Sequence, residues 1–158
     1  MAFATDYLSR RLYTIQIKNL NTSSLLKEKI ENCSGSIAWT NDSSAFLYSV
    51  RDPKTLRSNK IFKHVLGTNS SQDELIFHEK DPTFITSVTK SKSNKFLIIS
   101  SSSTLTTEYR FLDANKKSGA FKLFSKRKRG LEYTINHYDD YFFIITNKDD
   151  SPNYKLMK

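Results

Sequence analysis

An internal repeat is the strongest guide to the fold of this chain. The apolar runs AFLYSV, KFLIIS and YFFIIT align with one another, so that Phe96 lies 50 residues after Phe46 and Phe142 lies 46 residues after Phe96. Each run follows a polar turn, TNDSS, KSKSN or HYDD, and precedes an amphipathic run. Units of four short antiparallel strands that recur about every 40 to 50 residues are typical of β-propeller blades.

Runs rich in aromatic and β-branched residues alternate with Asn, Asp, Ser and Gly clusters along the whole chain, and helical periodicity is almost absent. This pattern predicts an all-β fold. The predicted strands are YTIQIKNL (13–20), GSIAWT (35–40), AFLYSV (45–50), NKIFKHVL (59–66), ELIFHE (74–79), FITSVTK (84–90), KFLIIS (95–100), EYRFLDA (108–114), AFKLFS (120–125), EYTINHY (132–138), YFFIIT (141–146) and NYKLMK (153–158). Two weaker candidates are MAFATD (1–6) and LLKEKI (25–30).

Grouped by the repeat, these runs predict one partial propeller domain over residues 1–158. It would hold a three-strand remnant, two whole four-stranded antiparallel blades and a final three-strand unit, which is about three and a half blades. Propellers close with about 4 to 8 blades. Either this chain closes as four blades by pairing its terminal strands, or it is part of a larger ring. Open sheet edges at its two ends would favour self-association.

The stretch FLIISSSSTLTTEYRFLD (96–113) places four serines beside charged residues and raises the question of a catalytic nucleophile. A nucleophile elbow requires G-x-S-x-G, yet the glycines are Gly35, Gly67, Gly119 and Gly130, and no two are four apart. The same spacing excludes both glycine-rich phosphate-binding motifs. We therefore expect a strand end and a turn here, with no catalytic and no cofactor-binding residues.

Metal binding is poorly supported, because the single cysteine, Cys33, and the histidines His64, His78 and His137 match no ligand spacing. We expect no metal site. One cysteine also forms no intramolecular disulfide, which suits a reducing compartment.

The start of the chain lacks the long apolar core of a secretory signal, and no apolar run approaches the roughly 20 residues that span a bilayer. We therefore expect a cytoplasmic protein without membrane contact.

The chain is basic, with 25 Lys+Arg against 16 Asp+Glu and a formal charge of +9. The run SKRKRG (125–130) resembles a phosphate-binding patch, although we interpret it as a charged turn between strands. Glu108 and Arg110 lie on one side of a predicted strand, as a partly exposed pair facing charges on a neighbouring strand. The alternative function that these features favour is a separate binding module for nucleic acid or an acidic protein.

The aligned blocks resemble the N-terminal propeller of the oligopeptidase B group, serine peptidases of the prolyl oligopeptidase family. The likeness covers nearly the whole chain and keeps the order and approximate spacing of the family. The stretches that carry it are RRLYTIQIKNL (10–20), IENCSGSIAWTNDSSAFLYSVRDPKTLR (30–57), KHVLGT (63–68), ELIFHEKDPTF (74–84), SKSNKFLIISSSSTLTTEYRFLDA (91–114) and RGLEYTINHYDDYFFIITN (129–147).

The resemblance implies a seven-bladed propeller that covers an α/β-hydrolase domain with a Ser-Asp-His triad. Such enzymes cleave short peptides after Lys or Arg, and the propeller acts as a lid that excludes folded proteins. This chain would supply part of the lid, without the remaining blades, the hydrolase domain or any triad residue. We therefore expect a truncated or split peptidase, inactive alone, whose partner is a separate chain carrying the hydrolase domain and whose short basic substrates bind only in a complete enzyme.

Overall fold

The computed structural model describes residues 1–116 and 118–158, and strands dominate it. The strands are β1 (Ala2–Thr5), β2 (Tyr13–Lys18), β3 (Leu25–Trp39), β4 (Ala45–Arg51), β5 (Ser58–Val65), β6 (Glu74–His78), β7 (Ile85–Lys90), β8 (Phe96–Ser102), β9 (Thr107–Asp113), β10 (Lys122–Leu123), β11 (Tyr133–Tyr138), β12 (Tyr141–Thr146) and β13 (Lys155–Met157). One 3-10 turn, η1 (Ser70–Gln72), precedes β6. The predicted all-β class is confirmed.

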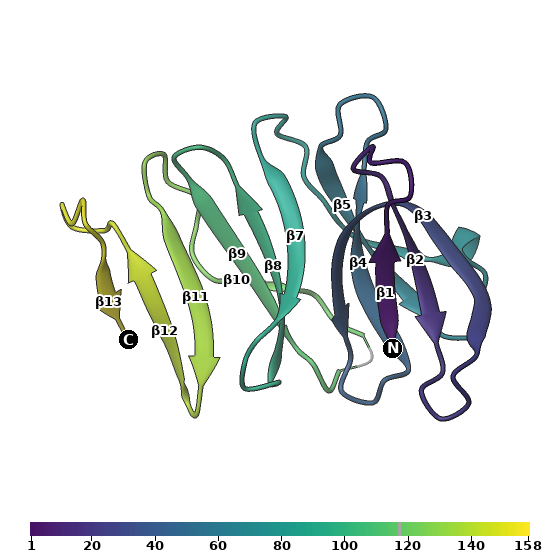
Figure 1. Ribbon diagram of the computed structural model, residues 1–158. Coiled ribbons are helices and arrows are strands. Elements are labelled where there is room, and N and C mark those ends of the chain that lie inside the picture. Colours follow the sequence, from purple (N-terminus) through teal and green to yellow (C-terminus); the bar gives the residue numbers. More distant parts are fainter. Residues whose placement is uncertain (117) are drawn as a thin grey trace.

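Three antiparallel sheets follow one another along the chain and stand side by side (Figure 1). The first sheet has the order β1-β2-β3-β4-β5-β6, the second β10-β9-β8-β7, and the third β11-β12-β13. Each sheet is a run of consecutive strands, as in propeller blades. Every predicted run contains a strand, although AFKLFS retains only the two residues of β10.

The predicted strands LLKEKI and GSIAWT are a single element, β3, which arches over at its centre (Figure 1). Its first half pairs with β2 and its second half with β4, and Cys33 pairs with both neighbours. Asn32 and Gly35 have positive φ angles of 58° and 89° at the bend. The two halves return to the same end of the sheet, where Leu26 and Trp39 line one pocket. The three-strand remnant is therefore hydrogen-bonded to the first blade within one sheet, not separated from it.

Apolar residues fill the space between successive layers. Inside the arch, the two halves of the first sheet bury Ile15, Ile17, Ile30, Cys33, Phe46 and Tyr48. Between the first and second sheets lie Ala38, Leu47, Ile61, Val88, Leu97, Ile99 and Ala114. The next interface is aromatic, and the ring centroids of Phe96 and Phe142 are 5.2 Å apart. Strand β4 thus contributes to the core from both of its faces, as expected for the covered middle strand of a blade.

The repeat is present, but its predicted register is wrong by one residue. Phe46 packs against the layer that precedes its own strand, whereas Phe96 packs against the layer that follows, in contact with Phe142. The equivalent of Phe46 is Leu97, which packs against the preceding sheet. A shift of one residue turns every side chain of a strand to its other face. Because residues 96 and 97 are both apolar, hydrophobicity alone does not distinguish the two alignments.

The turns before these strands support the corrected alignment. Thr40 Oγ1 accepts a hydrogen bond from the N–H of Ala45, and Ser91 Oγ accepts one from the N–H of Phe96. Thr40 therefore corresponds to Ser91, which places Phe46 opposite Leu97. The separation of the first two repeats is 51 residues, from 46 to 97.

Single hydroxyl groups join neighbouring sheets. Ser36 Oγ donates to the carbonyl of Val88 at 2.7 Å and accepts from its N–H at 2.8 Å. Thr107 Oγ1 bonds the carbonyl and N–H of Tyr133 in the same reciprocal way, at 2.9 and 2.8 Å. Each hydroxyl satisfies two backbone groups at a sheet boundary, where no strand ladder can reach them.

Candidate functional site

Three features that are far apart in the sequence meet between the first and second sheets. Arg127, from the basic run, reaches Glu79 at the end of the first sheet, with 2.7 Å between Nη2 and Oε2. The same nitrogen lies 3.2 Å from Oε1 of Glu108 on β9. We call Arg127, Glu79, Glu108 and Arg110 the ionic cluster. The sequence places these residues in separate motifs, and only the packing of the sheets brings them together.

Glu108 is more buried than predicted. Its exposed fraction is only 5%, and Arg110 Nη1 donates to its Oε1 at 2.5 Å. The expected partial exposure is therefore wrong for Glu108 but holds for Arg110, whose side chain is 24% exposed, and the expected charged partner on a neighbouring strand is wrong. Glu108 pairs with Arg110 on its own strand and with Arg127 from the connection that follows β10. Because a buried carboxylate needs such partners, this pairing is structural.

The connection between the first two sheets, residues 79–84, is bound from both sides. Arg57 donates from Nε to the carbonyl of Phe84 at 2.9 Å and from Nη2 to the carbonyl of Glu79 at 2.8 Å. Arg127 lies over the Phe84 ring, with Cζ 3.6 Å from the centroid. Two arginines from different parts of the chain thus hold this connection in place.

The ionic cluster favours its charged forms. Burial of Glu79 opposes ionisation, but hydrogen bonds from Arg127 and from the N–H of Asp81 outweigh it and lower the pKa of this carboxyl. Burial likewise opposes the charge on Arg127, whereas its bonds to Glu79 and Glu108 raise the pKa of the guanidinium. Both groups therefore remain ionised at neutral pH, and neither is adapted to exchange a proton there.

A surface groove of about 470 Å³ opens above the ionic cluster. It is lined by Asp81, Thr83, Phe84, Ser103, Thr104, Leu105, Thr106, Arg127 and Arg129. Its hydroxyl groups are used locally, since Thr106 Oγ1 accepts from the N–H of Gly130 and Ser103 Oγ donates to the carbonyl of Thr106. The groove offers a binding surface, not a catalytic constellation.

The serine run has the predicted local structure. Strand β8 ends at Ser102 and β9 begins at Thr107, so the remaining residues form the turn. Ser100 Oγ bonds Ser87 Oγ at 2.7 Å, and Ser101 is fully buried. These serines support strand pairing and the turn.

In the described part of the chain, the three histidines and the cysteine are not gathered at one metal site. His64 is fully buried, with Nδ1 2.8 Å from Oδ1 of Asp73, and Tyr48 donates to the other oxygen of Asp73 at 2.7 Å. His78 is exposed at the end of β6. Burial raises the pKa of Cys33 to about 12, so its thiol is inert at neutral pH. Among residues 1–116 and 118–158, no group of His, Cys, Asp and Glu is arranged to hold a metal ion.

One serine–histidine hydrogen bond was not predicted. Ser93 Oγ, in the turn between β7 and β8, lies 2.8 Å from Nδ1 of His137 on β11 of the third sheet. The His137 ring packs against Phe96 and Phe142, and burial together with the nearby Lys95 charge lowers its pKa. The partners are 44 positions apart, and no sequence pattern predicted their contact. The pair joins two sheets and lines none of the pockets described here.

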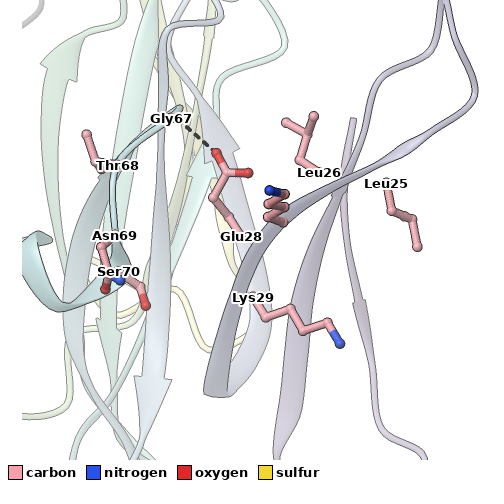
Figure 2. Close-up of a pocket in the computed structure, with 9 residues that line it drawn as sticks. Leu25, Leu26, Glu28, Lys29, Gly67, Thr68, Asn69 and Ser70 are labelled. Atoms are coloured by element: carbon pink, nitrogen blue, oxygen red, sulfur yellow. Dashed lines mark hydrogen bonds between the residues drawn. The ribbon is translucent and has the colours of Figure 1, made fainter.

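A larger groove, of about 790 Å³, runs between the start of β3 and residues 67–70. Figure 2 shows the carboxylate of Glu28 pointing to Gly67, whose N–H donates to it at 2.8 Å, while Lys29 points away. This carboxylate therefore holds the loop after β5.

A search of the described residues for a helix with the length and apolar character of a membrane span found none.

Comparison with known proteins agrees with this architecture. The family model for the N-terminal β-propeller domain of prolyl oligopeptidase matches residues 1–158. Dipeptidyl aminopeptidase BI of Pseudoxanthomonas mexicana is 38% identical over 157 residues, which are 99% of this chain and 22% of that protein. Protease 2 of Moraxella lacunata is 35% identical over 148 residues, 92% of this chain and 21% of that protein. The chain thus spans about a fifth of the length of these relatives.

Solved structures show the same likeness in three dimensions. Oligopeptidase B from Leishmania major superposes with a TM-score of 0.92 at 29% identity, over 99% of this chain and 22% of that one. The closed form of oligopeptidase B from Trypanosoma brucei, with covalently bound antipain, has a TM-score of 0.88 at 28% identity, over the same shares of the two chains.

Proposed function

Because this chain belongs to the prolyl oligopeptidase family, as part of its N-terminal β-propeller domain, we propose that it is the substrate-gating segment of a serine peptidase that cleaves short peptides after Lys or Arg. The role of the segment is steric: it admits short peptides and excludes folded proteins. The 158-residue chain has no peptidase activity alone, and the hydrolase domain that it covers is its partner. We place this partnership in the cytoplasm.

The observation that carries this proposal is the superposition with oligopeptidase B over 99% of the chain. The relatives of this chain include enzymes with different names, among them a dipeptidyl aminopeptidase and a protease 2. The proposed cleavage after Lys and Arg therefore rests on the likeness to oligopeptidase B in structure and in the sequence blocks described above.

A chimaera tests the proposal. This chain would replace the matching segment of the Moraxella lacunata protease 2, and the chimaera would be assayed on short peptide amides ending in Arg, Lys or Pro. We expect hydrolysis after Arg and Lys, no hydrolysis of the same sites in a folded protein, and no activity from the 158-residue chain alone. The unmodified protease 2 is the control.

Two results would contradict the proposal. One is a chimaera that melts cooperatively but cleaves only after Pro; the other is hydrolysis by the isolated chain. The alternative of a basic binding module has its own test, filter binding of single-stranded DNA at two salt concentrations. Binding that weakens steeply with salt would support that module, but Arg127 is already committed to the ionic cluster.

A further inference from the structure

The basic run SKRKRG at residues 125–130, here named the basic loop, lies between β10 and β11 and belongs to no strand. Ser125, Lys126, Lys128, Arg129 and Gly130 are exposed, and Arg127 alone is partly buried. The loop is preceded by the shortest strand of the described structure, the two-residue β10. It is therefore a connection with three exposed cations, flanked on one side by a strand with little pairing.

The backbone of the basic loop makes few hydrogen bonds. The carbonyl of Lys128 accepts from the N–H of Leu131 at 3.0 Å, and that of Gly130 accepts from Asn147 Nδ2 at 2.9 Å. The N–H of Phe124 donates to the carbonyl of Tyr109 at 2.9 Å, and that of Gly130 donates to Thr106 Oγ1 at 3.1 Å. Within the described part of the chain, the amide groups of residues 125–129 donate no hydrogen bond to another residue. Apart from the contacts of the Arg127 side chain, few hydrogen bonds have to break before this segment can extend.

Three other exposed basic loops in the described part of the chain are held by side-chain caps. Asp6 accepts from the N–H groups of Arg10 and Arg11, and Asp52 accepts from that of Lys54. The N–H of Lys148 donates to Thr146 Oγ1. An endopeptidase must draw several residues into an extended form, and such caps oppose this.

Arg127 makes the basic loop selective. An endopeptidase of basic specificity inserts the side chain before the cleaved bond into an acidic pocket. Arg127 can enter such a pocket only by giving up its ion pairs with Glu79 and Glu108, which would leave Glu108 paired with Arg110 and Glu79 without Arg127. The side chains of Lys126, Lys128 and Arg129 form no hydrogen bond or ion pair in the described structure, and they are free to enter it.

We propose that the basic loop is a proteolytic processing site for endopeptidases that cleave after Lys or Arg, cut after Lys126, Lys128 or Arg129 but not after Arg127. In the reaction the peptide C–N bond breaks and one water molecule is consumed. Its oxygen enters the new carboxylate, and its hydrogens go to the amine and to the medium. This inference does not depend on the proposed peptidase function.

The two pieces remain associated after the cut. The Thr107–Tyr133 hydrogen bonds cross the interface between the second and third sheets, as do the aromatic contacts of Phe96 with His137 and Phe142. None of these contacts depends on an intact basic loop. The product is a two-chain form of the same fold.

Limited digestion of the folded 158-residue chain with trypsin tests the inference, with intact-mass spectrometry at early times. We expect the first products to end at residue 126, 128 or 129, and the two pieces to elute together until urea is added. Cleavage after Arg127 should be about 100-fold slower, as expected from the cost of unpairing a buried ion pair. First cuts in another loop, or equal cutting after Arg127, would overturn the proposal.

Two variants sharpen this experiment. The triple variant K126Q/K128Q/R129Q removes exposed cations only, so it should keep the melting temperature and lose the early cuts. The double variant E79Q/E108Q releases Arg127 and should add a cut after it. If the double variant fails to fold, the triple variant still tests the proposal. Early cutting of the basic loop in the triple variant would refute cleavage after Lys126, Lys128 or Arg129.

Discussion

At the residue scale, Arg127 differs from the cations beside it in a way that the sequence does not reveal. Residues 126–129 are four consecutive Lys or Arg residues, and composition alone does not distinguish Arg127 from its three neighbours. One turns inward because two buried carboxylates, Glu79 and Glu108, lie on the side that it faces. The sequence predicted a charged turn here, but the ion pairs required the packing of two sheets.

Replacing Glu79 by glutamine tests the ionic cluster. Since the pKa of Glu79 is lowered in the folded chain, its ionised form stabilises the fold above the ordinary Glu pKa of about 4.3. This stabilisation disappears as the pH falls through the lowered value. We expect E79Q to reduce the free energy of unfolding at pH 7 by about 1.5 to 3 kcal/mol and to flatten its decline in acid.

Urea unfolding at pH 7 and at acidic pH would measure the effect. The matched control is E31Q, since Glu31 is exposed and its loss should change stability by less than about 0.5 kcal/mol. Equal losses in the two variants, or an unchanged acid slope in E79Q, would contradict the role given to Glu79.

At the scale of elements, β3 shows where local reasoning succeeds and where it stops. The sequence predicted strands at 25–30 and 35–40, and both segments are extended. It did not predict that the chain continues from one to the other without leaving the sheet. The bend needs left-handed backbone at Asn32 and Gly35, residue types that adopt it at low cost.

Replacing Gly35 by alanine tests the bend. A Cβ at Gly35 would meet Ala4 and Tyr13 at 3.8 and 3.9 Å, which is ordinary contact, so the cost comes from the φ angle of 89°. We expect G35A to lower the free energy of unfolding by about 1 to 2 kcal/mol. G35N should lose less, because Asn tolerates positive φ. Equal stability of G35A and the unmodified chain in thermal unfolding would contradict this account.

At the scale of the whole molecule, the three sheets have unequal surroundings. The first two are each covered by the next sheet, whereas the outer face of the third exposes Tyr138, Ile145 and Leu156, by 72%, 52% and 68% respectively. An exposed apolar group of this kind favours association. The sequence predicted self-association through open edges, and the structure adds an apolar face as a second cause.

Light scattering of the 158-residue chain would test this prediction. We expect an apparent mass above that of the monomer that rises with concentration, and we expect I145K/L156K to lower it toward 18.3 kDa. The control is L8K, because Leu8 is equally exposed but lies in the turn between β1 and β2. A sharply melting monomer at high concentration would show that the chain is self-contained.

The amino-acid sequence by itself determined the strands, the turns and the repeat, because alternation of apolar residues and the turn preferences of Asn, Asp, Ser and Gly act locally. Only the tertiary structure decided the register of the repeat, since Phe96 and Leu97 are both apolar and pack against layers on opposite sides of their strand. It also decided which cation of the basic loop joins Glu79 and Glu108. Both choices depend on what the neighbouring sheet presents, and contacts between residues far apart in the chain leave no periodic signal in the sequence.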